Sequence, residues 1–371
     1  MLTVFITMNF VLNMSASVFN GILDQLAIEL NVSVSQSGLL NSLYSFGAGI
    51  GVPVFLLLCH KSDKTILLKK MLILDLVSSV LLVFTHSFIP LLAIRFLMGF
   101  AGNCYAVLAT ATIVSLSPSD KLGKYLSLMI AGSALAMIVG VPFVRAVSSL
   151  MSWQQIFIIL IILMVLSLVY FIFNLKSDMS YAEMNIRDEL NFLSKKQVQV
   201  ILITSLFTFI GYGFQVYTTP YILTLYPEFE SNMSLILVLI GISSFIGNMM
   251  GGIFCDRIGY RKAYTYGAIL LAVTSSVLLF TQNYAIVNLI LLIMWMGIAW
   301  FIGLQINTAI NVVTEGKSKF MISLNSSTIQ LGTALGSSIA AIIISSAGIQ
   351  WIIIPAILAS IITAIILVMN K

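Results

Sequence analysis

Long apolar stretches, each able to cross a bilayer as a helix, constrain this chain more than any other feature of its sequence. A membrane-spanning α-helix needs roughly 20 apolar residues. Twelve such stretches lie at about 3–25, 36–58, 68–86, 89–112, 124–147, 153–174, 199–222, 233–254, 264–282, 284–307, 321–346 and 349–369. Their apolar residues are continuous rather than alternating, which favours helices over the strands of a membrane barrel. The sequence therefore predicts an all-α polytopic membrane protein with twelve transmembrane helices.

The composition excludes a soluble protein and several functional classes. Only 8% of the residues are charged and 60% are hydrophobic, whereas an average soluble domain is about 25% charged. The net charge of +5 falls in short loops between apolar stretches, so we expect a lipid bilayer and no nucleic acid as partner. Three cysteines and two histidines show no metal-ligand spacing, and no phosphate-binding Gly-x-x-x-x-Gly-Lys loop occurs. We expect no enzyme, no metal and no cofactor.

The positive charges predict the orientation. Of the 18 lysines and arginines, 16 lie in alternate loops or at the C-terminal residue, and the other two are Arg95 and Arg145. Because cytoplasmic loops carry the excess of lysine and arginine, both termini and the central loop are predicted to be cytoplasmic. No cleavable signal peptide is evident, and we expect the first stretch to be a retained helix. Abundant isoleucine, asparagine and lysine suggest a bacterial plasma membrane.

A single long polar segment, residues 176–198, divides the chain. Residues 1–175 and 199–371 would then form two six-helix bundles joined by a cytoplasmic linker. Such duplication is typical of membrane proteins with a central pathway between their halves. Within the linker, residues 181–190 fit either a short surface helix or an irregular connection.

A glycine pair followed by Asp-Arg-x-Gly-x-Arg-Lys lies between the eighth and ninth stretches, at 251–262. Glycines let two helices approach closely, and Asp256 is suited to accept from helix N-terminal amides or from a basic partner. An ordinary positively charged loop is the alternative interpretation. The motif resembles the signature loop of the major facilitator superfamily.

Further segments resemble one branch of this superfamily, the drug and metabolite exporters similar to arabinose efflux permeases. Residues 20–40 are similar to the end of the first helix and the start of the second. Arg95 followed by Gly99 resembles the helix 4 motif, Gly140 with Pro142 resembles the helix 5 bend that marks exporters, and 323–336 resembles helix 11. The resemblance implies two pseudo-symmetric six-helix bundles in a monomer. It also implies a secondary transporter, namely a proton-coupled efflux antiporter for a drug-like compound or small metabolite, as in multidrug resistance.

The sequence departs from this pattern at two places. The first-half copy of the loop motif, near 51–64, is degenerate, and the glutamate that many efflux members carry in helix 1 is missing near 14–17. The usual proton-carrying group is therefore in doubt. Two alternatives stay open: an uptake symporter or facilitator of a small solute, and a membrane sensor that no longer transports.

Ionisable residues within the apolar stretches are the candidates for coupling to protons, because a charge there is costly. We predict that Asp24 pairs with Arg95, so that protonating the acid frees the arginine. Alternatively, Asp24 caps a helix end in water. Asp75 is either a proton site or a carboxylate that reaches the interface to pair with a lysine. Arg145 would line the outer vestibule or anchor its helix at the interface.

The candidate substrate-cavity residues are polar or aromatic: Tyr212, Gln215, Tyr217, Trp300 and Asn103. Singly, each is more typical of packing or interhelical hydrogen bonding. Together they predict an aromatic, weakly polar cavity for a lipophilic or neutral small molecule.

The loop motif is predicted to act in gating. Its candidate residues are Gly252, Asp256, Arg257, Gly259 and Arg261. We expect Asp256 and Arg257 to latch neighbouring helix ends on the cytoplasmic side in the outward-open state.

Overall fold

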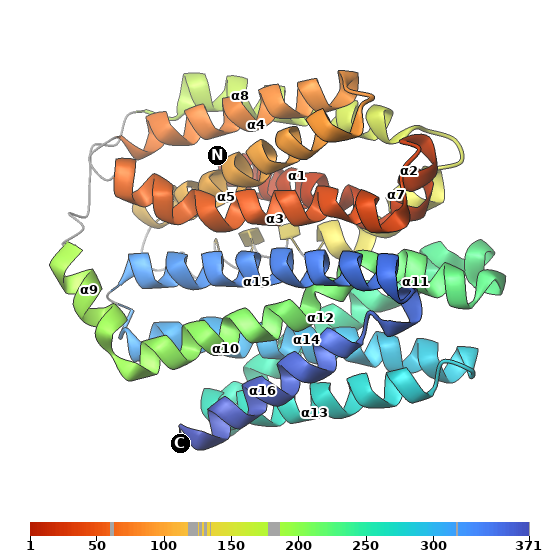
Figure 1. Cartoon of the computed structure of the whole chain (residues 1–371). Coiled ribbons are helices and arrows are strands. Elements are labelled where there is room, and N and C mark those ends of the chain that lie inside the picture. Colours follow the sequence, from red (N-terminus) through yellow and green to blue (C-terminus); the bar gives the residue numbers. More distant parts are fainter. Residues whose placement is uncertain are drawn as a thin grey trace.

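The computed structural model describes residues 1–59, 63–117, 125, 128–129, 132–133, 135–176, 186–316 and 318–370, and these residues form helices joined by short turns (Figure 1). The part before the linker contains α1 (Leu2–Gly21), α2 (Leu23–Glu29), α3 (Val34–Cys59), α4 (Lys64–Phe84), α5 (Phe88–Leu116), the π-helix η1 (Ala136–Gly140), α7 (Val141–Val147) and α8 (Trp153–Asn174).

The part from the linker onward also consists of helices. It contains α9 (Ile186–Ser194), α10 (Lys196–Tyr212), the 3₁₀-helix η2 (Gly213–Tyr217), α11 (Thr218–Leu225), the 3₁₀-helix η3 (Pro227–Asn232), α12 (Met233–Ile258), α13 (Tyr260–Phe280), α14 (Ala285–Val313), α15 (Lys319–Ser346), the 3₁₀-helix η4 (Ile349–Trp351) and α16 (Ile354–Met369). The linker is thus helical over Ile186–Ser194, while 177–185 lie outside the described residues.

Ten helical segments of the described chain are long and apolar enough to cross a membrane, and they correspond to ten of the twelve predicted spans. The third predicted span is α4, which carries Lys64, Lys69, Lys70 and Asp75 and is therefore less apolar. The fifth predicted span, 124–147, lies partly outside the described residues, and its described end forms η1 and α7.

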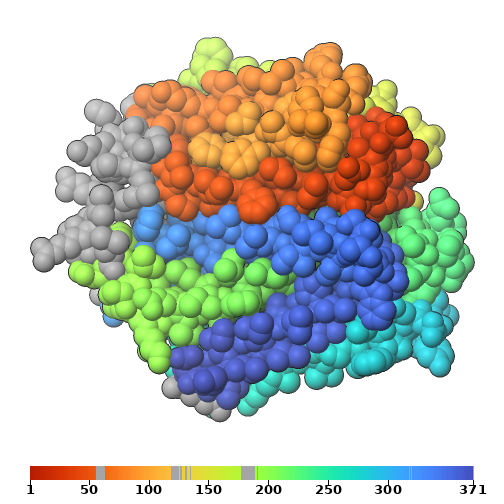
Figure 2. Space-filling view, in the orientation of Figure 1, coloured from red at the N-terminus to blue at the C-terminus, as the bar shows by residue number. Residues whose placement is uncertain are grey.

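The helices form two layers (Figure 1). Helices α1 to α8 surround one hydrophobic cluster, which includes Phe5, Phe157 and Phe171. Most of a second cluster lies in α10 to α16, around Trp295 and Tyr264. We call these layers the first half and the second half, and Figure 2 shows them meeting along α3 and α15.

Both chain termini lie toward one end of the helices, which we call the terminal end (left in Figure 1). The other end holds α2 and α11, and we call it the α2–α11 end. At this second end Tyr226 donates a hydrogen bond to the carbonyl of Gln282 at 2.8 Å. Burial raises the pKa of the Tyr226 hydroxyl further above physiological pH, at which a tyrosine is already protonated.

Two predicted spans are broken where the sequence weakens the helix. The first ends at Gly21, because Ile22 leaves helical geometry (φ −131°), and α2 follows in a new direction. In the fifth, Pro142 has no N–H to donate to the preceding turn, and π-helical η1 lies directly before it. A Cβ on Gly140 would overlap the sulfur of Met14, so glycine lets η1 lie against α1.

The loop motif is the end of α12, a turn at Gly259, and the start of α13. Gly259 adopts φ +79° and ψ 152°, a conformation that is essentially restricted to glycine. One turn before the motif, Gly247 lies against the backbone of Gly297 in α14. The glycines therefore bring α12 and α14 together, and Gly259 ends α12.

Candidate functional site

Two adjoining cavities lie between the helices, and they share Asn13 of α1. The first has a volume of about 80 Å³ and lies between the halves, with Asn13, Ser133, Met137, Ile138, Gly241, Ser244, Phe245, Asn248 and Trp300 in its wall. The second has a volume of about 100 Å³ and is lined by Asn9, Leu12, Asn13, Ala16, Tyr44, Ala48, Gly102, Asn103, Ala106 and Gln330. Neither lining contains a charged side chain among its described residues.

A cluster of amide and hydroxyl groups forms the polar wall of these cavities. The amide nitrogens of Asn9 and Asn13 both donate to the Oγ of Ser133, at 2.8 Å and 3.0 Å. Asn13 also donates to the carbonyl of Asn9 at 2.7 Å. These bonds join α1 to the fifth predicted span and fix the polar groups in place.

Two of the five predicted substrate-cavity residues, Asn103 and Trp300, lie in these walls. The side chain of Tyr212 instead packs on Phe209 and Trp295, and its hydroxyl donates to the carbonyl of Ala299. Tyr212 therefore contributes to the core of the second half in this structure.

The remaining two predicted cavity residues, Gln215 and Tyr217, lie in η2 toward the α2–α11 end. Gln215 is half-buried. Tyr217 is fully buried, and its hydroxyl donates to the carbonyl of Ser35 at 3.1 Å. Its ring lies directly against Gly38, where a Cβ would overlap the hydroxyl and the ring. Tyr217 therefore packs between the halves, beyond the cavity.

Three direct hydrogen bonds join the first half to the second half among the described residues, and all lie toward the α2–α11 end. Besides the bond from Tyr217 to Ser35, Thr219 donates to the carbonyl of Asn20 at 2.9 Å. The third joins the hydroxyls of Ser42 and Ser337 at 2.7 Å. We call this set of bonds the α2–α11 seal.

Arg95 is fully buried, but it does not pair with Asp24 as predicted from the sequence. Its guanidinium donates to the carbonyls of Ser15 and Ala16, each at 2.9 Å, and to Oδ1 of Asn41 at 3.0 Å. The rings of Phe19 and Tyr44 lie 4.9 Å and 4.5 Å from its central carbon. Neutral acceptors and aromatic faces therefore hold this cation between α1 and α3.

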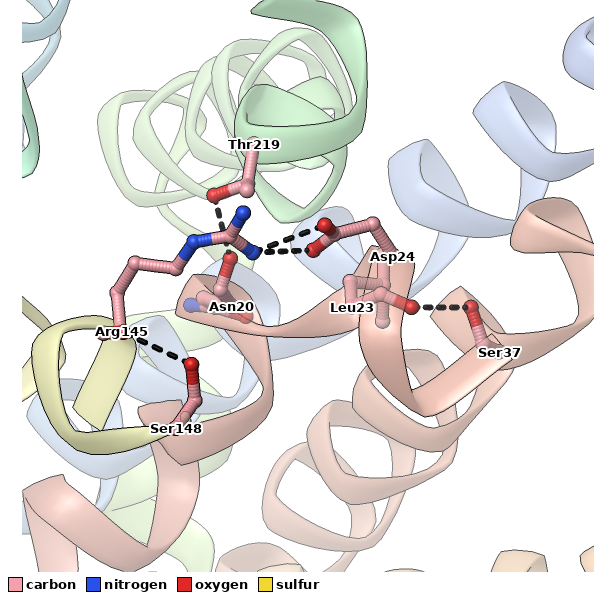
Figure 3. A network of polar contacts seen from close by, with 7 residues as sticks. All are labelled: Asn20, Leu23, Asp24, Ser37, Arg145, Ser148 and Thr219. Carbon is pink, nitrogen blue, oxygen red and sulfur yellow. Dashed lines mark hydrogen bonds and ion pairs between the residues drawn. The ribbon is translucent and has the colours of Figure 1, made fainter. Parts of the chain in front are cut away.

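Asp24 forms its ion pair with Arg145 of α7, and both carboxylate oxygens accept from Nη1 at 2.8 Å (Figure 3). The break after Gly21 explains the difference from the prediction, because α2 turns Asp24 away from the axis of α1 toward α7. The pair is partly sheltered, with 6% of the Arg145 side chain and 25% of the Asp24 side chain exposed. It ties α2 to α7 beside the α2–α11 seal.

Asp75 lies inside the first half and does not reach the interface. It is 1% exposed, and its Oδ2 has no hydrogen-bond partner among the described residues. Arg95 of α5 and Tyr44 of α3 interact with its carboxylate electrostatically. This geometry contradicts pairing with an interfacial lysine and leaves the proton-site interpretation open.

The gating motif lies at the terminal end. Asp256 and Arg257 are exposed, and neither forms an ion pair with a described residue. An ideal Cβ on Gly252 would lie 3.6 Å from the side chain of Leu304, which is an ordinary van der Waals contact. Arg261 is exposed at the start of α13, where it borders a cavity with Lys196 and Asn370. The latch expected for the outward-open state is thus not formed here by these residues.

Sequence reasoning missed the partner of Asp24 and several polar side chains of the cavity walls, namely Asn9, Tyr44, Ser133, Ser244, Asn248 and Gln330. A signal for Asn9 existed, because Asn9 and Asn13 are four residues apart and share one face of a helix. Arg145 was recognised as an ionisable residue of a membrane helix, but its partner depends on the break at Ile22.

A multi-pass helical protein with an uncharged cavity between two halves, sealed toward one end, belongs to the class of membrane transport proteins. The family model of the Major Facilitator Superfamily matches residues 5–252 and 230–370. The chain therefore belongs to the Major Facilitator Superfamily: it is a secondary transmembrane transporter and not an enzyme.

Similar proteins agree with this assignment. The chain is 25% identical to the MFS-type transporter YbcL of Bacillus subtilis over 348 residues, which cover 93% of this chain and 89% of YbcL. It is 27% identical to the inner membrane transport protein YdhP of Escherichia coli over 342 residues, or 90% and 86% of the two chains. The crystal structure of a D-xylose–proton symporter superposes with a TM-score of 0.77 over 98% of this chain and 96% of that one. At 15% identity the symporter establishes the fold alone.

Proposed function

We propose that the protein is a proton-coupled antiporter that exports a small molecule across the bacterial plasma membrane by alternating access. Residues 1–175 and 199–371 would be the two moving bundles, with both termini in the cytoplasm. The α2–α11 end would then face outward, and the structure would represent a state closed to the outside.

The observation that carries the proposal is the α2–α11 seal next to uncharged cavities. Hydrogen bonds such as those of Thr219 and Tyr217 are individually weak, each contributing about 0.5–1.5 kcal/mol. Such a seal can therefore form and break during a transport cycle. Close glycine contacts let the bundles meet, for instance Gly241 of α12 against the Cα of Ile138, which would lie 2.8 Å from an ideal Cβ.

A path from Asp75 to this seal supports proton coupling. Arg95 interacts electrostatically with Asp75 and donates to Asn41. Asn41 in turn donates to Oδ1 of Asn20 at 2.8 Å, and the backbone carbonyl of Asn20 accepts from Thr219 of the second half. Protonating Asp75 would remove a negative charge that attracts Arg95, and so change how firmly Arg95 holds α1 and α3.

Two further features support the direction and the gating. The Gly140–Pro142 segment resembles the exporter bend, which favours efflux. The exposed Asp256 and Arg257 would form their latch at the terminal end when the α2–α11 seal opens. A drug-like compound or a small metabolite is then carried outward while protons move inward.

The Asp75→Asn variant tests the coupling in proteoliposomes. We expect it to lose accumulation driven by a pH gradient but to keep substrate exchange across the membrane, because exchange needs no net proton movement. Asp256→Asn is the matched control and should retain gradient-driven transport, although more slowly. The substrate would come from a growth screen of an overexpressing strain against a compound panel.

The coupling assignment would be wrong if Asp75→Asn, Asp24→Asn and Arg95→Ala all kept full transport driven by the pH gradient. Substrate accumulation in energised cells, rather than exclusion, would favour uptake. A complete absence of flux for the wild-type protein would favour a sensor.

A further inference from the structure

We infer that the transported molecule is a small neutral solute rich in hydroxyl groups, rather than a lipophilic cation or an anion. This inference deepens the proposed function and depends on it, because it assumes that the two cavities around Asn13 hold the substrate.

The absence of charge in the cavity walls is the first step. Among the residues that the structure describes, neither cavity lining contains an acidic or a basic side chain. The nearby guanidinium of Arg95 lies under the ring of Tyr44, which does line the second cavity. Its donors are directed to the carbonyls of Ser15 and Ala16 and to Asn41. A charged ligand would therefore lose its hydration without gaining a counter-ion, which is costly.

The hydrogen-bonding pattern around Ser133 is the second step. Its Oγ accepts from both Asn9 and Asn13, so both of its lone pairs are occupied, and its hydrogen has no acceptor among the described residues. The Oδ1 of Asn13 accepts no hydrogen bond from a described residue, although both hydrogens of its amide group have acceptors nearby. A donor and an acceptor thus lie side by side. A hydroxyl group can satisfy both, because it accepts and donates at once.

The second cavity continues the same pattern. The amide nitrogen of Asn103 donates to the carbonyl of Ala48 at 2.7 Å, which leaves Oδ1 as an acceptor without a described donor. Gln330 lines the same cavity with an amide side chain. A ligand that spans both cavities therefore needs a further group able to donate.

The first cavity also has apolar surface in its wall. Trp300 and Phe245 line the first cavity together with Met137 and Ile138. An aromatic face suits the C–H surface of a ring or chain whose hydroxyls point the other way. The cavities, at about 80 Å³ and 100 Å³, are small beside the 300–1,000 Å³ typical of sites for drug-sized ligands. Monosaccharides and polyols combine these properties.

Binding to the purified full-length protein tests the inference. The neutral probes are D-xylose, xylitol and myo-inositol, the cationic probe is tetraphenylphosphonium, and the anionic probe is benzoate. Affinity is measured by titration calorimetry, with thermal unfolding to verify that each variant is folded. We expect at least one neutral probe to bind, and Ser133→Ala to weaken its binding roughly tenfold through loss of one hydrogen bond.

Two further variants sharpen the test. Ser276→Ala is the matched control, since this serine bonds to the carbonyl of Ala272 within α13 and lies outside the cavity walls. It should bind the neutral probe like the wild type. Asn13→Asp adds a carboxylate to the shared wall, and we expect it to lose the neutral probe and gain affinity for tetraphenylphosphonium.

The outcomes separate this inference from the proposed function. If tetraphenylphosphonium binds the wild type and is exported while no neutral probe binds, the neutral-solute inference is overturned and proton-coupled export stands. If a neutral probe binds through Ser133 but never moves with protons, the inference stands and the proposed antiport fails. The absence of neutral-probe binding at the highest soluble concentration overturns the inference in every case.

Discussion

The Gly38→Ala variant should open the α2–α11 seal. Three atoms of the Tyr217 side chain lie closer than 3.0 Å to an ideal Cβ on Gly38, a range in which something must shift. Tyr217 is fully buried, so its ring is enclosed by other residues. Inserting a methyl group into such packing costs about 1–3 kcal/mol, and displacing the ring also loses the bond to Ser35.

This cost falls on the sealed state, because the seal brings Gly38 and Tyr217 together. A change of about 1–3 kcal/mol shifts a two-state equilibrium by roughly 5- to 150-fold. The shift can be measured as a distance distribution between spin labels at Glu29 in α2 and Glu228 in η3, which are both exposed. We expect a longer distance to become the main component in Gly38→Ala.

Gly303→Ala is the matched control for this experiment. It replaces a helical glycine whose ideal Cβ has its nearest neighbour at 3.9 Å, so the methyl group fits. Its distance distribution should match the wild type. On a Tyr217→Ala background, Gly38→Ala should have no further effect, because the obstructing ring is gone. An unchanged distribution in Gly38→Ala itself would refute the role of this contact in the seal.

Three further predictions concern charges and turns. Arg145→Ala leaves the partly sheltered Asp24 carboxylate without its cation, and we expect the free energy of unfolding to fall by about 1.5–3 kcal/mol, measured by thermal unfolding. Asp24→Asn should destabilise the Arg145→Ala variant little further, and additive effects of the two substitutions would contradict the pairing. Gly259→Ala should destabilise the protein by about 1–3 kcal/mol through backbone strain alone, since no atom lies within 4 Å of an ideal Cβ, whereas Gly252→Ala should be tolerated. Asp256→Asn should slow turnover without changing the range of substrates; a changed range would show that this residue contacts substrate.

The sequence predicted the membrane class and most of the helices, because hydrocarbon thickness sets a length that can be read directly from apolar stretches. It also located the loop motif at 251–262, within which Gly259 adopts the positive φ that other residues avoid. These features depend on local chemistry, which a single sequence displays. The bend near Pro142, where the π-helical segment lies, was expected from the family resemblance.

The pairing of charges could not be predicted in the same way. In a continuous first helix, Asp24 would lie at a depth similar to that of Arg95 in the fourth predicted span. Pairing with Arg145 becomes the better alternative only because α1 breaks at Ile22. Tyr217 looked like a cavity residue because tyrosine suits both substrate and backbone contacts. Its role in the seal depends on the close approach of Gly38, which lies 179 residues earlier in the chain.

Proton movement during downhill substrate flow tests the proposed antiport most directly. Proteoliposomes would hold the pH-sensitive dye pyranine inside, start at equal pH on both sides, and receive an excess of the neutral substrate outside. In an antiporter the substrate enters and protons leave, so we predict that the interior becomes alkaline, and that Asp75→Asn abolishes the signal. This sign does not depend on how the protein is oriented in the vesicle. Acidification of the interior would show symport and contradict the proposal, as would substrate entry without any change in pH.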